Sequence, residues 1–274
     1  PALAVPTLDL LRKQDPKDIE VEMRLASALY KSGSRSDGRD MLDARMKAEP
    51  NNPIPLTTLA HLLAWEERWT DVAEQVANWT ARHPEDVLVV TSVASLLTAR
   101  GNVEAIKVAE NLLRAAMERN PSSVPAVSSL AMLMQSSERT AEAVALNYRV
   151  LDLDPNNVIA LNNLAWALCE DKQQYREAVE LANRGLKIAP DYVDLLDTRG
   201  VILYRLGQLD KATEDFTRCI DLYPPNARAV TSVYFHLARC HDEMGSSDKA
   251  RECFEKTMDL QGRVGGLSTA DLAE

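Results

Sequence analysis

The sequence has few aromatic residues, no long apolar run and no excess of positive charge. Aromatic side chains make up only 5% of the 274 residues. No apolar run approaches the roughly 18 residues of a membrane-spanning helix, so no membrane insertion of this chain is expected. The formal net charge of −10 argues against a nucleic-acid partner, because phosphate binding needs a basic surface. A solvated acidic surface and a basic partner both remain compatible with this charge.

Catalytic motifs are missing as well. The sequence contains no P-loop, no GxGxxG, no HExxH and no GxSxG. Adjacent carboxylates such as Glu66 and Glu67 are interpreted as solvation of a helix face rather than as an acid–base pair. We therefore predict no catalytic residue, no cofactor and no enzymatic activity for this chain.

The cysteines include no CxxC pair, which argues against a disulfide framework and against a zinc site. All four lie in predicted helices, where they suit the role of small buried hydrophobes: Cys169, Cys219, Cys240 and Cys253. Their apparent lack of pairing slightly favours the cytoplasm over the periplasm. His236 and Cys240 are four residues apart and share a helix face, but the tight spacing of further ligands is absent, so packing is predicted and no metal.

What the sequence does contain is a repeat with a period near 34 residues. Prolines at the end of each period are separated by 34, 34, 37, 34, 35 and 34 residues: Pro16, Pro50, Pro84, Pro121, Pro155, Pro190 and Pro224. The stretch Val158–Pro190 shows the unit most clearly, because its apolar residues follow two helical faces separated by a polar break. Alanine or glycine recurs at fixed places in both helices, so that their backbones can approach closely. Such a period indicates an array of helix–turn–helix units.

The pattern resembles the tetratricopeptide repeat (TPR). The residues that carry the resemblance are Leu161, Leu164, Ala165, Leu168, Ala178, Ala182 and Pro190, and again Gly200, Leu203, Gly207, Ala212, Phe216 and Pro224. The resemblance implies an all-α, right-handed superhelical solenoid. Residues 1–18 would hold the second helix of a truncated repeat. Seven repeats would follow at about 19–52, 53–86, 87–123, 124–157, 158–192, 193–226 and 227–262. Because the chain starts at Pro1 without Met, we interpret it as a fragment of a longer chain.

Three irregularities lead to local predictions. The surplus of three residues before Pro121 predicts a longer turn between Gly101 and Ala109. About four extra residues after Pro224 predict either a first helix that begins a turn early or a longer linker. Residues 263–274 form a tail or the start of a capping helix, with Ser268 as N-cap and Asp271 in a capping box. If helical, this tail would cover the apolar face that the last repeat leaves open.

In the family resembled, the first helix of each repeat lines the concave surface, where ligands usually bind. Short hydrogen-bonding side chains recur there, with a few large ones that could serve as apolar anchors. The predicted peptide-binding groove comprises Thr57, Thr58, His61, Trp65, Thr91, Ser92, Ser95, Ser128, Ser129, Met132, Asn162, Asn163, Trp166 and Thr198. The alternative is that small polar residues are simply tolerated on a solvated face. On the second helices, Trp79 and Tyr148 are further candidates for partner contact, although core packing suits Trp79 at least as well.

The predicted function is non-catalytic protein–protein interaction, with a peptide segment of a partner in the groove. A self-associating scaffold and possible homo-oligomer is the first alternative. The second is a substrate-recruiting arm of a larger enzyme or of an envelope or secretion assembly. The last possibility comes from a generic resemblance of residues 162–212 to bacterial TPR proteins near such systems, which also favours a bacterial origin.

Overall fold

The protein is all-α. The computed structural model describes residues 1–170, 173–224, 227–268 and 271–273, and in this part of the chain no strand occurs. Two 3₁₀ turns, Ala2–Ala4 and Asp271–Ala273, lie near the two ends. The α-helices are α1 (Val5–Gln14), α2 (Ile19–Ser32), α3 (Arg35–Ala48), α4 (Ile54–Trp65), α5 (Trp69–Arg82), α6 (Val87–Thr98), α7 (Val103–Arg119), α8 (Val124–Ser136), α9 (Thr140–Leu153), α10 (Val158–Glu170), α11 (Tyr175–Ile188), α12 (Val193–Arg205), α13 (Leu209–Leu222), α14 (Arg228–Glu243) and α15 (Ser247–Val264).

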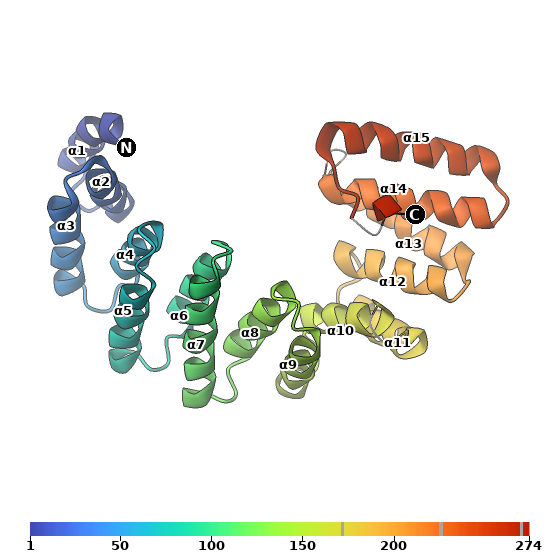
Figure 1. Cartoon of the computed structure of the whole chain (residues 1–274), viewed down its shortest axis with the longest axis horizontal. Coiled ribbons are helices and arrows are strands. Elements are labelled where there is room, and N and C mark those ends of the chain that lie inside the picture. Colours follow the sequence, from blue (N-terminus) through green and yellow to red (C-terminus); the bar gives the residue numbers. More distant parts are fainter. Residues whose placement is uncertain (171–172, 225–226, 269–270, 274) are drawn as a thin grey trace. The chain divides into compact units, whose positions relative to one another are not determined.

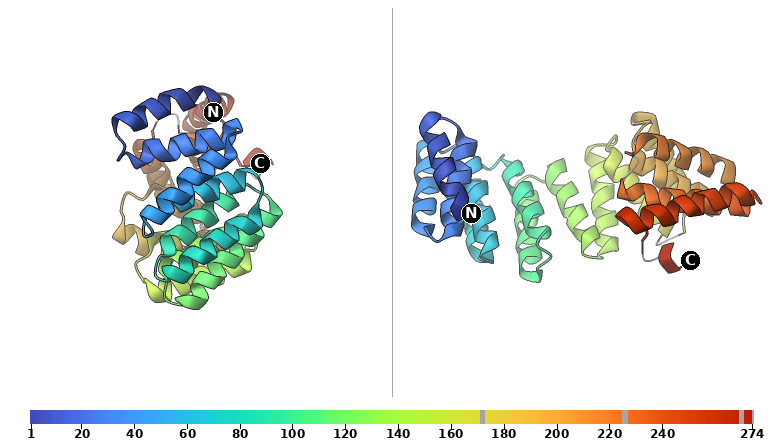
Figure 2. Two further views of the ribbon diagram at one scale, coloured as in Figure 1. Left: turned by 90° about the vertical axis from the view of Figure 1, so that its left-hand side faces the viewer. Right: turned by 90° about the horizontal axis from the view of Figure 1, so that it is seen from above.

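The helices group into two compact units, Pro1–Arg139 and Thr140–Glu274. Unit 1 contains α1 to α8, and unit 2 contains α9 to α15. Within each unit, most helices pack against the next one along the chain, and the first helix of each repeat also packs against the first helix of the following repeat. The first helices of successive repeats therefore form one row (α2, α4, α6 and α8 in unit 1; α10, α12 and α14 in unit 2), which is the arrangement of an all-α helical-repeat solenoid (Figures 1 and 2).

Local chemistry explains several of the helix ends. Asn157 accepts a hydrogen bond from the backbone N–H of Ala160 at 3.1 Å and so caps the start of α10. Turns within the hairpins need a left-handed residue, which is Gly207 between α12 and α13 (φ +72°). Where glycine is missing, Glu67, Glu138 and Gln173 adopt positive φ themselves.

The core of unit 2 combines small residues on facing helices with one large side chain. Ala165, Ala178 and Ala212 are fully buried, and Phe216 fills the space beside Gly200. The cysteines belong to the same kind of environment. Cys169, Cys219 and Cys240 are buried, Cys253 is half-buried, and all four are free. Burial raises the pKa of the Cys169 and Cys240 thiols to about 11, so these side chains act as small hydrophobes, as the sequence predicts.

Two of the predicted irregularities have a clear outcome. The prediction of a longer turn between Gly101 and Ala109 was wrong. The surplus residues instead extend α7, which begins at Val103 because Asn102 caps it by accepting hydrogen bonds from Glu104 and Ala105. The extra residues in the last repeat do start a helix early: α14 begins at Arg228, ten residues before the small residue Ala238, whereas α10 begins seven residues before Ala165. Residues 225–226 lie outside the described residues.

No helix in the described ranges unites the length and the apolar character that crossing a bilayer requires.

Candidate functional site

The predicted groove residues lie on first helices of both units. In unit 1 they are on α4, α6 and α8, and in unit 2 they are on α10 and α12. The large side chains among them are exposed, with 61% of the surface of Met132 and 39% of that of Trp166 open to solvent. The exposed parts of these apolar side chains are available for a ligand.

The hydroxyl groups beside them are partly engaged within their own helices. Thr57 and Thr58 donate hydrogen bonds to the carbonyl oxygen of Ile54, at 3.0 and 2.8 Å. Thr91 donates to the carbonyl oxygen of Leu88 at 3.1 Å. A hydroxyl that donates to its own helix keeps its acceptor lone pairs. These positions therefore offer acceptors, rather than donors, to a peptide backbone.

Two predicted groove residues face the wrong way for that role. Thr198 is buried, with 6% of its surface exposed, so the prediction that it contacts a groove ligand was wrong. Asn163 is half-buried, and its amide donates to the buried Asn147 on α9 at 3.4 Å. Both residues lie on the side of their helix that faces a second helix, where packing decides the orientation.

The two aromatic candidates on second helices differ in burial. Trp79 is buried, and its indole N–H donates to Asp86 at 2.9 Å, so it packs in the core and is not a contact surface. Tyr148 is exposed, and its hydroxyl donates to Glu177 at 3.3 Å.

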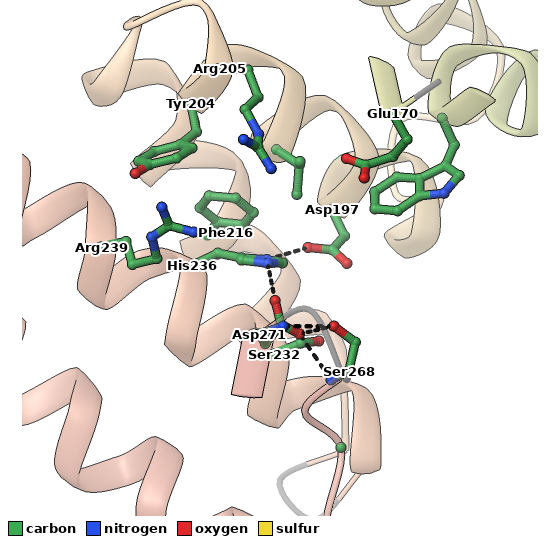
Figure 3. Close-up of a pocket in the computed structure, with 13 residues that line it drawn as sticks. Glu170, Asp197, Tyr204, Arg205, Phe216, Ser232, His236, Arg239, Ser268 and Asp271 are labelled. Carbon is green, nitrogen blue, oxygen red and sulfur yellow. Dashed lines mark hydrogen bonds and ion pairs between the residues drawn. The ribbon is translucent and has the colours of Figure 1, made fainter. Parts of the chain in front are cut away.

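In unit 2 a pocket of about 230 Å³ opens between α10, α12, α14 and the tail that follows α15. Figure 3 shows its lining, in which polar side chains from these elements surround the ring of Phe216. The lining residues are Trp166 and Glu170 of α10; Asp197, Val201, Tyr204 and Arg205 of α12; Phe216 of α13; Ser232, His236 and Arg239 of α14; and Gly266, Ser268 and Asp271 of the tail. The guanidinium of Arg239 stacks over the ring of Tyr204 at 4.9 Å.

His236 is the electrostatic centre of this pocket. Its Nδ1 lies 3.6 Å from an oxygen of Asp197, and its Nε2 lies 3.5 Å from an oxygen of Asp271 (Figure 3). Burial by itself lowers the pKa of His236, but the two carboxylates outweigh burial and raise this pKa to about 9. The contact with His236, together with hydrogen bonds from Ser268, lowers the pKa of Asp271 to about 2. At neutral pH the pocket thus holds an imidazolium between two carboxylates.

The tail is ordered by its own capping box and by two close approaches to α14. Ser268 and Asp271 form the predicted capping box, in which the Asp271 N–H donates to Ser268 Oγ and the Ser268 N–H donates to the Asp271 carboxylate, both at 3.0 Å. Thr231 of α14 donates to the carbonyl oxygen of Gly265 at 2.7 Å. Gly266 has φ +131°, and a Cβ there would lie 2.1 Å from the carbonyl oxygen of Arg228. Only glycine can therefore occupy this position.

The location of the tail corrects one prediction. The sequence predicts that a helical tail covers the apolar face left open by the last repeat, but the tail lies over α14 beside the pocket. The outer face of α15 stays open, with Met258 68% exposed. In the observed position the Asp271 carboxylate lies 3.5 Å from Nε2 of His236, which favours this location of the tail electrostatically. Residues 269–270 and 274 lie outside the described residues.

The metal alternative for His236 and Cys240 receives no support from the described residues. Among these, no group of three or more His, Cys, Asp or Glu side chains could hold a metal ion. The two ring nitrogens of His236 face carboxylates, while Cys240 is buried in the core with the apolar side chains. His241 is buried too, where desolvation lowers its pKa.

Sequence reasoning missed His236 as a groove residue, although a signal was present. His236 stands two residues before the small residue Ala238, just as Asn163 stands two residues before Ala165. In its own repeat, His236 therefore occupies the position that Asn163 and Thr198 occupy in theirs. The partnership with Asp271 could not be found in this way, because it depends on where the tail folds.

Repeated helical hairpins that pack through small residues, and a ligand-sized pocket on the row of first helices, define the protein as a helical-repeat solenoid. Family comparison makes the assignment specific. A family model described as tetratricopeptide repeat matches residues 192–262, and a second family model with the same description matches residues 148–180. The chain thus contains tetratricopeptide repeats in these two stretches.

Two curated relatives show the same repeats in longer proteins. The chain is 26% identical over 207 residues to the TPR repeat-containing protein PA4667 of Pseudomonas aeruginosa, covering 75% of this chain and 29% of that protein. It is 32% identical over 111 residues to the protein CTR9 homolog of Arabidopsis thaliana, covering 39% of this chain and 10% of that protein. The chain thus spans less than a third of the length of either relative.

Solved structures share the fold at low sequence identity. YrrB, described as a TPR protein with an unusual peptide-binding site, superposes with a TM-score of 0.55 at 19% identity, covering 70% of this chain and 94% of YrrB. BtubC from P. vanneervenii gives a TM-score of 0.60 at 16% identity, with 74% and 91% coverage. MamA from Desulfovibrio magneticus RS-1 gives 0.55 at 20% identity, with 65% and 96% coverage. At these identities the likeness establishes the fold alone.

Proposed function

We propose that this chain is a non-catalytic protein–protein interaction scaffold whose first helices bind a peptide segment of a partner. The observation that carries this proposal is the exposure of Met132 and Trp166 on first helices, each beside short polar side chains. An exposed aromatic or thioether side chain on a rigid helix is a typical anchor for a partner's apolar residue.

The local chemistry suits a polypeptide. Hydroxyl groups such as those of Thr57 and Thr91 keep acceptor capacity for backbone N–H groups, because their protons are used within the helix. In unit 2, Trp166 lines the pocket beside Val201 and Arg205, which gives an apolar wall and a cation at one place. The family assignment supports an interaction role, and the peptide-binding site named for YrrB supports the peptide as ligand class.

The test uses two single variants and a matched control. Trp166→Ala and Met132→Ala should each weaken binding of the partner by about tenfold or more, as expected for anchors that contribute about 1.4 kcal/mol or above. Met258→Ala removes an equally exposed side chain from the second helix α15 and should leave binding unchanged. Isothermal titration with the purified partner measures all three. Equal affinity of wild type, Trp166→Ala and Met132→Ala would exclude the first helices as the binding surface.

A self-associating scaffold is the second candidate, because Met258 and Phe254 line a shallow apolar surface on α15. Light scattering of the wild type and of Met258→Glu distinguishes the two functions. Association that Met258→Glu abolishes would support assembly through α15, whereas a monomer at all concentrations would leave peptide binding as the function.

A further inference from the structure

We propose that the pocket of unit 2 is a binding site for a helical turn that presents a carboxylate, and that the chain's own tail occupies this site as an intramolecular competitor. This inference rests on the proposed function and names the ligand of one site: an acidic peptide segment of a partner, which must displace Asp271 to bind.

The part of the site that would receive a carboxylate is formed by residues of the repeats. Asp197 on α12 and His236 on α14 both lie on first helices, and a carboxylate oxygen of Asp197 lies 3.6 Å from Nδ1 on one side of the imidazole ring. This arrangement leaves Nε2 directed at the tail. Phe216 and Phe235 flank the ring with centroid distances of 5.4 and 6.0 Å. The ring is therefore oriented by the fold, and its second nitrogen is available to a carboxylate that the repeats themselves do not supply.

The group that occupies the site belongs to a short sequence pattern in the tail, and a partner could contain the same pattern. Asp271 is oriented by Ser268, with which it exchanges hydrogen bonds in a capping box. A capping box needs only a serine or threonine followed three residues later by a carboxylate, so a partner segment that begins a helix with this pattern presents the same group. The tail thus shows which peptide geometry the site accepts.

The tail does not fill the pocket. A volume of about 230 Å³ remains, bordered by Trp166, Tyr204 and Arg205 on the side of α10 and α12. A partner that places its carboxylate at His236 and adds an apolar side chain against Trp166 would make contacts that the tail lacks. These additional contacts would allow a partner segment to displace the tail, although the tail is present at high effective concentration because it belongs to the same chain.

Local charge favours an acidic ligand even though the chain as a whole is acidic. The groups facing His236 are Asp197 of α12 and Asp271 of the tail, while Arg205 of α12, Arg239 of α14 itself and Glu170 of α10 border the same pocket. If Asp271 withdraws, His236 loses one of its two carboxylate neighbours. A carboxylate from outside would take the place of Asp271 beside Nε2.

The first experiment tests whether the tail occupies the site, and it needs no partner. NMR titration of the His236 imidazole in the full chain should give a pKa near 9 for the wild type. Asp271→Asn removes the tail carboxylate, and Gly266→Ala forces the tail away from α14 without touching a charge; both should lower the pKa of His236 clearly. Asp259→Asn removes a carboxylate of the same charge from an exposed pair on α15 and should leave it unchanged. An unchanged His236 titration in both tail variants would overturn the proposal.

The second experiment tests competition, with the synthetic peptide GGLSTADLAE as the probe. It should bind Asp271→Asn about tenfold more tightly than wild type, as expected when one charge-assisted contact is freed. Binding should be lost in Asp271→Asn combined with His236→Gln, and for a peptide with asparagine in place of its aspartate. Equal affinity of the two peptides would refute carboxylate recognition. Failure of the proposed function would give a different result. Trp166→Ala and Met132→Ala would leave partner binding unchanged, while the tail variants would still lower the pKa of His236.

Discussion

Gly200 shows how a single missing side chain shapes the core of a repeat. A Cβ at this position would lie 2.5 Å from Cε1 of Phe216, which is itself fully buried. The aromatic ring therefore occupies the space that alanine fills at Ala165, one repeat earlier. The repeat pattern marks this position as small, but only the packing shows that it must be glycine.

Gly200→Ala should destabilise the protein by about 1–2 kcal/mol, because overpacking outweighs the gain in helix propensity. Gly262→Ala in α15 is the matched control. A Cβ added at Gly262 would meet no atom of the described residues within 4 Å, so this change should stabilise by about 0.5–1 kcal/mol. Urea unfolding followed by circular dichroism measures both, and a stabilised Gly200→Ala would show that Phe216 can move freely.

His236 also makes stability depend on pH. Its pKa is raised from 6.5 to about 9 in the folded state, so its contribution is complete below pH 6.5 and disappears as pH rises through 9. Wild type should exceed His236→Gln by about 1–3 kcal/mol at pH 6, and the difference should shrink at pH 10. At low pH, the contribution of Asp271 to stability is lost as pH falls from 3.8 through about 2. The contributions of His236 and Asp271 describe the same ion pair, so the two free energies are not added.

The measurement is the difference in unfolding free energy between wild type and His236→Gln across this range. In Asp271→Asn, the same His236→Gln substitution should show a weaker pH dependence between 6.5 and 9. A dependence of equal size there would assign the effect to Asp197 alone.

At the scale of helices, α12 and α13 are joined by an ion pair where most repeats have apolar contacts. Arg199 sits at the position of Leu164, and it donates to both oxygens of Asp215, at 2.7 and 2.6 Å, and to Asn183 of α11 at 2.8 Å. Asp215 is buried, with 5% of its surface exposed. This pair links three helices through one guanidinium.

Arg199→Leu should destabilise the protein by about 2–3 kcal/mol, because it leaves the Asp215 carboxylate buried without its partner. The double variant Arg199→Leu with Asp215→Leu should recover most of this loss, since an apolar pair resembles the contact made at Leu164. Chemical denaturation of the two single variants and the double variant gives the coupling energy. Additive effects would mean that Arg199 acts through Asn183 rather than through Asp215.

The helices themselves were largely predictable, since each apolar stripe and each closing proline has a local cause. The errors have physical reasons of the same kind. Three surplus residues can lengthen either a turn or a helix, and the capping by Asn102 selected the helix. For Trp79 the sequence left both an exposed and a buried orientation open, and in the structure the indole is buried and donates to Asp86.

At the scale of the whole molecule, each helix packs mainly against near neighbours along the chain, and the contacts separate into two compact units. Stability in such an array is approximately a sum over repeats and their adjacent interfaces. A local defect is therefore expected to weaken its own surroundings rather than the entire chain.

Hydrogen exchange should reveal this locality. Gly200→Ala in unit 2 should speed exchange of the amides in α12 and α13 while leaving α4 and α5 of unit 1 as protected as in wild type. Mass spectrometry of peptic fragments measures both regions in one experiment. Uniformly faster exchange would mean that the chain unfolds as a single cooperative unit.

The sequence alone determined the repeats, their small contact residues and the presence of polar side chains with a few anchors on the first helices. These features are periodic, and a helix repeats its faces every 3.6 residues whatever surrounds it. Tertiary structure decided which of these first-helix side chains are available to a ligand. Thr198 is buried, the Asn163 amide donates a hydrogen bond to Asn147, and Trp166 remains exposed. It also decided that Asp271 meets His236, because a contact between a tail and a helix 35 residues earlier depends on packing and charge rather than on any period.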